Sequence, residues 1–96
     1  MNRHNDKNIK DLVSSFISHY KLKPKYMEFK IREYWMEEMN PMVNRYTMEI
    51  KVVNKKLIVS ISSASVKHEL NLDRTKIKDQ INEFLGEKFL LDVMIR

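Results

Sequence analysis

The sequence predicts an α+β fold in which three strands form one mixed sheet and the helices pack mainly on one face of that sheet. Three patterns carry this prediction. Apolar residues recur at helical spacing in the first forty residues and again in residues 66–85, they alternate at strand spacing in residues 47–62, and they form a short run in residues 89–95. The expected order of elements is helix, helix, strand, strand, helix, strand.

Two helices are expected before the sheet. Residues 9–20 place their apolar side chains on one helical face, and Asn8 is a suitable N-cap for them. The second helix is expected to run from Lys25 to Met39 and to end at Asn40, because a residue that precedes a proline disfavours helical geometry. Its expected inner stripe consists of Met27, Ile31, Tyr34, Trp35 and Met39.

The next segment is typical of a β-hairpin. Residues 47–52 and 57–62 alternate between apolar and polar side chains, and residues 54–56 between them form the expected turn. In the first strand, Met48, Ile50 and Val52 are expected to face the core.

A long third helix and a last strand complete the expected fold. The serines of residues 62–65 are suitable caps for a helix that runs as far as Gly86, with residues 71–73 as a possible kink. Residues 89–95 are expected to form a strand that reaches the sheet by a crossover connection. On this strand Phe89, Leu91, Val93 and Ile95 are expected to face the helices.

The opposite face of the sheet is the first candidate for an interface. Leu90 and Met94 on the last strand, together with Ile58 on the second, are expected to leave an apolar patch there. The alternative is that the first helix covers this patch.

The length and composition of the chain predict a single domain. It has 96 residues, of which 43% are hydrophobic, and we assign residues 8–96 to a single domain preceded by a flexible N-terminus at residues 1–7. The chain has no cysteine, which fits a reducing compartment. Its first twenty residues contain no continuous apolar segment, so we expect neither a signal peptide nor a membrane anchor, and a cytoplasmic location.

Excess positive charge gathers in the first third of the chain. Residues 1–30 hold seven Lys or Arg against three Asp or Glu. Between residues 20 and 30, lysines interleave with aromatic rings, as they do in proteins that bind single-stranded nucleic acid. The alternative is a solvated helix surface whose rings belong to the core. The candidate nucleic-acid contacts are Lys21, Lys23, Lys25, Lys30 and, more weakly, Arg45.

Catalytic and metal-binding motifs are missing. His4, His19 and His68 have no second histidine or cysteine at ligand spacing, and the adjacent Glu37 and Glu38 point in different directions on a helix. The single glycine excludes a glycine-rich phosphate loop. We therefore expect no enzyme, no cofactor, no metal and no small-molecule substrate.

Several features in the middle of the chain follow one another in a recognisable order. They are Trp35 at a helix end, then Val43, Arg45, Tyr46 and Thr47, then residues 57–59, then Ser62 and Ser63, and finally Glu69 and Leu70. In this order and spacing the chain resembles the DciA family of small bacterial proteins, from about residue 9 to residue 96. The family often has glycine where Asn40 stands, a departure that concerns the local turn.

The resemblance implies a KH-like fold and a role in loading or operating the replicative DNA helicase (DnaB). Longer family members carry a disordered basic tail that this sequence does not show, so weak binding of single-stranded DNA is expected. The glycine count also speaks against RNA recognition through the GXXG loop of KH domains. Two alternatives stay open, namely an RNA-binding or ribosome-associated module and a protein–protein adaptor.

Overall fold

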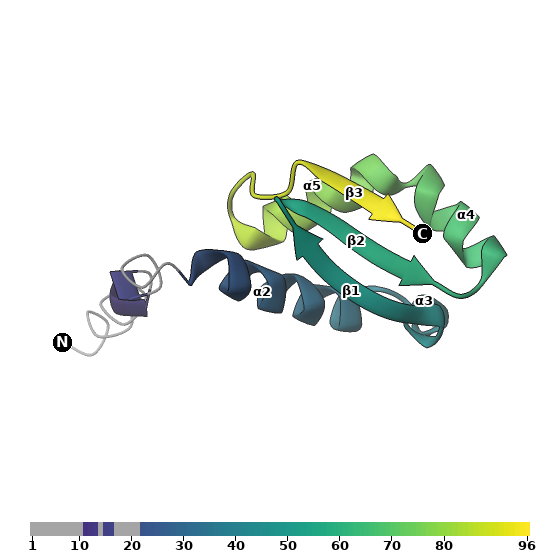
Figure 1. Cartoon of the computed structure of the whole chain (residues 1–96), viewed down its shortest axis with the longest axis horizontal. Helices are drawn as coiled ribbons and strands as arrows, with labels where there is room; N and C mark the ends of the chain where they lie inside the picture. The colour runs from purple at the N-terminus through teal and green to yellow at the C-terminus, as the bar shows by residue number, and fades with distance from the viewer. Residues whose placement is uncertain (1–10, 14, 17–21) are drawn as a thin grey trace.

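The computed structural model describes residues 11–13, 15–16 and 22–96 (Figure 1). The expected first helix lies largely outside these residues, and its described part, residues 11–13 and 15–16, is helical and exposed. The elements that follow are α2 (Lys23–Glu38), α3 (Pro41–Tyr46), β1 (Thr47–Val53), β2 (Lys56–Ile61), α4 (Ala64–Leu72), α5 (Arg74–Leu85) and β3 (Asp92–Ile95).

The three strands form one mixed sheet in the order β1-β2-β3, as the sequence predicted. β1 and β2 pair antiparallel through a two-residue turn, whereas β2 and β3 pair parallel. The parallel pair requires a crossover connection, and α4 and α5 supply it. In Figure 1 the sheet lies in front of α5, and among the described helices none covers its other face.

The segment between α2 and the sheet is a short helix, α3, which the sequence analysis did not predict. The Asn40 side chain caps it by accepting a hydrogen bond from the Val43 amide at 2.9 Å, and Pro41 occupies its first turn. The Asn44 amide in turn donates to the carbonyls of Met36 and Met39, each at 3.2 Å, and closes the end of α2. The prediction missed α3 because Asn40-Pro41 ends one helix and starts the next.

The hairpin confirms the predicted strands but corrects the position of Met48. Asn54 and Lys55 both have positive φ angles, 50° and 62°, which suit a tight hairpin turn. At the other end of β1 the register shifts between Thr47 and Glu49, which is the signature of a β-bulge. Because of this bulge, Met48 is 71% exposed instead of facing the core.

The predicted long helix is divided where the sequence allowed a kink. Ser63 caps α4 by accepting a hydrogen bond from the Val66 amide, and Asp73 separates α4 from α5 with a non-helical backbone. Gly86 ends α5 in the left-handed conformation, with φ at 81°.

The last strand is shorter than expected, and the predicted facing of Leu90 and Leu91 is wrong. Leu90 is 2% exposed and belongs to the core, whereas Leu91 is 68% exposed. The physical reason is Asn82 on α5, whose side chain accepts a hydrogen bond from the Leu90 amide at 2.8 Å and donates one to the Leu90 carbonyl at 3.0 Å. These two bonds hold residue 90 against the helix before regular strand geometry begins at Asp92.

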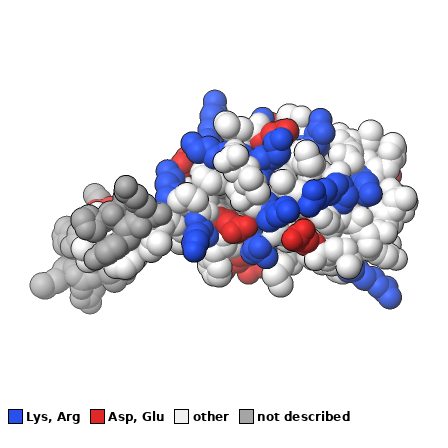
Figure 2. All heavy atoms as spheres, in the orientation of Figure 1, with Lys and Arg blue, Asp and Glu red and all other residues white. Residues whose placement is uncertain are grey.

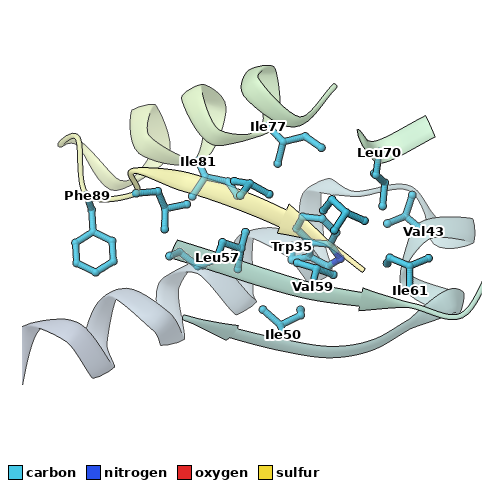
Figure 3. Close-up of a cluster of buried hydrophobic side chains, with 14 of the residues drawn as sticks. Trp35, Val43, Ile50, Leu57, Val59, Ile61, Leu70, Ile77, Ile81 and Phe89 are labelled. Carbon is cyan, nitrogen blue, oxygen red and sulfur yellow. The ribbon is translucent and has the colours of Figure 1, made fainter. Parts of the chain in front are cut away.

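The core lies between the sheet and the helices (Figure 3). Trp35 from α2 is fully buried in it, and its indole Nε1 donates a hydrogen bond to Thr47 Oγ1 at 3.1 Å. The predicted inner stripe of α2 is confirmed at Met27, Ile31 and Trp35.

Candidate nucleic-acid and partner interfaces

The open face of the sheet carries two of the three residues predicted as a partner patch. Ile58 on β2 lies in register with Met94 on β3 and with Lys51 on β1. Ile58 is partly buried and Met94 is 38% exposed. Leu90 is buried and is therefore not part of this face. Of the three predicted patch residues, Ile58 and Met94 therefore lie on the open face.

Charged side chains of both signs surround this pair. Arg96 lies 3.9 Å from Glu49 as an ion pair, and its Nε donates to Ser60 Oγ at 3.4 Å. Lys51 and Lys56 belong to the same face by register. Figure 2 shows basic side chains spread over the sheet with acidic ones among them. This face is mixed in charge, with a basic excess.

Some of the lysines predicted to contact nucleic acid already form ion pairs within the chain. Lys21 lies outside the described residues. Lys23 forms an ion pair with Glu87 at 2.8 Å. Lys30 pairs with Glu33 at 3.8 Å and lies 5.2 Å from the centre of the Phe84 ring.

Lys25 and Arg45 are exposed cations that lie far apart in the structure. Lys25, in the first turn of α2, forms no ion pair within the described part of the chain. Arg45 is in the last turn of α3, which follows the other end of α2, roughly 20 Å away along the helix axis. The structure therefore does not bring Arg45 next to the predicted lysines.

An exposed stripe on α2 combines cations with apolar side chains. Lys25, Phe29, Arg32 and Met36 follow one another at the spacing of a single helical face, and all four are exposed. Phe29 is 60% exposed and Met36 is 69% exposed. The sequence analysis did not select Arg32, although helical spacing from Lys25 and Phe29 would have found it. We call these four residues the α2 stripe.

At each edge of the sheet, a side-chain carboxylate accepts a hydrogen bond from a backbone amide of the edge strand. At the β1 edge, a Glu28 carboxylate oxygen accepts a hydrogen bond from the Val52 amide at 3.0 Å and lies 3.6 Å from Arg32. At the β3 edge, Asp92 accepts from the Val93 amide at 2.8 Å. Such capping discourages pairing of the edge with another strand.

A groove opens between α3 and the end of α2 on one side and α4 and α5 on the other. We call it the α3–α5 groove; its volume is about 500 Å³. Its floor is formed by core residues, and acidic side chains stand among its walls. The lining residues are Glu38, Met39, Asn40, Met42, Val43, Val66, Glu69, Leu70, Asp73, Lys76, Ile77 and Gln80. The sequence analysis did not identify this groove, because it forms only when α3 packs beside the divided helix.

Tyr34 is the titratable group near this region with a perturbed environment. Burial raises its pKa above the ordinary value of 10.0, and the negative charges of Glu38 and Glu83 raise it further. Its ring lies 5.1 Å from that of Phe84, centre to centre.

The described residues contain no cluster of three or more His, Cys, Asp or Glu side chains that could hold a metal ion. Among the helices that the structure describes, none is both long and apolar enough to cross a membrane.

A comparison with known protein families identifies a family to which the chain is similar. The family model described as "Dna[CI] antecedent, DciA" matches residues 8–95. No curated protein and no solved structure matches the chain.

Proposed function

This chain belongs to the DciA family, and from that membership we propose that it is a non-enzymatic accessory protein of DNA replication that binds the replicative helicase (DnaB) and assists its loading. The observation that carries the proposal is the length of the match, which covers residues 8–95 and thus every described helix and strand from α2 to β3. A KH-like description of the fold and a cytoplasmic location belong to the same proposal.

The architecture supports a binding role. The polar residues with the most specific contacts, such as Asn82 and Thr47, hold the fold together through hydrogen bonds to the backbone. Exposed apolar side chains are instead spread over several surfaces, and they include Phe29, Met36 and Met42. Exposed methionines are suited to adaptable contacts with a protein partner.

Weak binding of single-stranded DNA is the second part of the proposal. The α2 stripe supports it, because Lys25 can reach a phosphate and the exposed Phe29 ring can stack on a base. Arg32, which is ion-paired with Glu28 at 3.6 Å, is a weaker contact on the same stripe. Lys21, Lys23, Lys30 and Arg45 remain proposed contacts. Lys25 is the strongest of them, since Lys23 and Lys30 are already paired with carboxylates.

The DNA proposal is tested by replacing Lys25 with Glu and Phe29 with Ala in one variant. Because both side chains are exposed, the fold should be kept, while affinity for a single-stranded oligonucleotide and its dependence on salt should fall. Lys67→Glu on α4 is a control with the same change of charge. Equal loss of affinity in the control would reject the α2 stripe as the contact.

Ile58 and Met94 remain a proposed partner contact on the open face. The pair is small and lies beside Lys51, so we assign it a supporting role. The alternatives of an RNA-binding module and of an adaptor for another protein predict different companions in the cell. Capture of the tagged chain followed by mass spectrometry and RNA sequencing should return the helicase; ribosomal RNA or an unrelated protein in its place would contradict the proposal.

A further inference from the structure

The α3–α5 groove is a largely apolar surface to which the proposed function assigns no role. The groove reaches down to the core, because it is lined by the buried residues Val43, Val66, Leu70 and Ile77. Met42, on its rim, is 62% exposed. Burial of such a surface by a partner removes apolar area from water and is favourable.

The walls of the groove carry an excess of negative charge on a chain whose formal net charge is +5. The lining contains three carboxylates and one lysine, Lys76. The carboxylates belong to Glu38 at the end of α2, Glu69 on α4 and Asp73 at the junction of α4 and α5. Within the described residues none of these three carboxylates forms an ion pair, whereas Glu28, Glu33, Glu49, Asp79 and Glu87 each do. The groove therefore offers carboxylates that have no ion-pair partner in the described part of the chain.

The negative charge of the groove indicates which class of partner it can bind. Phosphates would be repelled by Glu38, Glu69 and Asp73, which excludes nucleic acid from this groove. An apolar floor between acidic walls is complementary to a helix that has apolar residues on one face and Lys or Arg beside them. The methionines Met39 and Met42 can adapt to the shape of such a helix.

We infer that the α3–α5 groove binds a basic amphipathic helix of a protein partner. The inference rests on the proposed function for the identity of that partner, the replicative helicase. It also places the helicase on a different surface from the DNA, which contacts the basic α2 stripe. One small domain thus holds an anionic docking site and a cationic one.

Two probes test the inference on the full chain. The first is a short synthetic helix of Leu and Lys, compared with the same helix of Leu and Glu, while the methyl signals of Met39 and Met42 are followed by NMR. The second is the purified helicase, whose affinity is measured by titration. Glu38→Lys combined with Glu69→Lys reverses the charge of opposite walls, and Glu37→Lys combined with Glu83→Lys is the matched control outside the groove. All four positions are exposed, and thermal unfolding checks that both variants fold.

We expect the Leu–Lys helix to shift both methionine signals and the Leu–Glu helix to leave them unchanged. The groove variant should bind the Leu–Lys helix and the helicase at least about tenfold more weakly, and the control should bind both as the wild-type chain does. Peptide binding in the groove without helicase binding would contradict the proposed function while supporting a site for a basic segment. Unmoved methionine signals, or equal helicase affinity in the groove variant, would overturn the inference. Self-association that is lost in the groove variant would also overturn it, because the occupant would then be a second copy.

Discussion

The indole Nε1 of Trp35 donates a hydrogen bond to Oγ1 of Thr47 at 3.1 Å and so ties the middle of the molecule together across twelve residues. The Thr47 hydroxyl in turn donates a hydrogen bond to the Val43 carbonyl at 2.7 Å. This chain of two bonds links α2, α3 and β1 at the point where the bulge brings Thr47 into the position opposite Ile61. It holds α3 in place, and α3 is one wall of the proposed docking groove.

Thr47→Val should therefore destabilise the domain. The substitution removes the acceptor of the buried indole N–H and the donor to the Val43 carbonyl, and we expect the free energy of unfolding to fall by about 2 kcal/mol. Trp35→Phe tests the same bond from the other side. In a double-mutant cycle based on chemical unfolding, the two substitutions should show a coupling of about 1 kcal/mol. Full additivity would contradict a shared hydrogen bond.

Asn82→Ala should be among the more damaging polar substitutions. Asn82 is 8% exposed, and its loss would leave both the amide and the carbonyl of buried Leu90 without their partner. We expect unfolding to become easier by about 2–3 kcal/mol, measured by urea denaturation. The matched control is Asn71→Ala, because Asn71 makes a single bond of 3.5 Å to the Ile95 carbonyl and is exposed. Similar losses in the two variants would show that Leu90 is held by something other than Asn82.

Glu28→Ala should expose the β1 edge. The Val52 amide would lose its side-chain partner, which we expect to cost about 1 kcal/mol and to promote pairing between edges of two molecules. Glu28→Gln keeps an oxygen acceptor and serves as the control. Sedimentation velocity should find self-association in the alanine variant only. If both variants stay monomeric and equally stable, the carboxylate does not protect the edge.

Stability should decline at high pH through Tyr34. Its pKa is raised in the folded chain by burial, and then by Glu38 and Glu83, so the unfolded chain loses the phenolic proton first as pH rises past 10.0. Folding stability from this group is therefore complete below that pH and is lost above it. Glu38→Gln should lower the Tyr34 pKa toward its ordinary value, as followed by NMR titration. An unchanged pKa in this variant would show that the charge of Glu38 does not act on Tyr34.

Local patterns in the sequence predicted most of the fold. Helical spacing located α2 with its buried Trp35, strand alternation located the hairpin, and Gly86 marked the end of α5. One error occurs where a tertiary contact overrides a local pattern. Leu90 and Leu91 exchange their expected exposures because Asn82 binds the backbone eight residues away.

The candidate interfaces were less predictable than the core. Charge and aromatic content pointed to the first turns of α2, but ion pairs such as Lys23 with Glu87 join residues far apart in the sequence and change which cations are available. Arg32 was missed because the sequence analysis did not ask which residues share the helical face of Lys25. The α3–α5 groove could not be predicted, because its acidic residues come from α2, from α4 and from the junction of α4 and α5, and local patterns do not specify how these segments pack.

Direct titration of the purified chain with the purified replicative helicase tests the central claim most directly. Because the match to the DciA family covers residues 8–95, we predict a saturable complex with defined stoichiometry at micromolar concentrations or below. In a separate assay without the helicase, the chain should hydrolyse no nucleotide. Absence of any complex across the micromolar range, with a chain shown to be folded, would contradict the account.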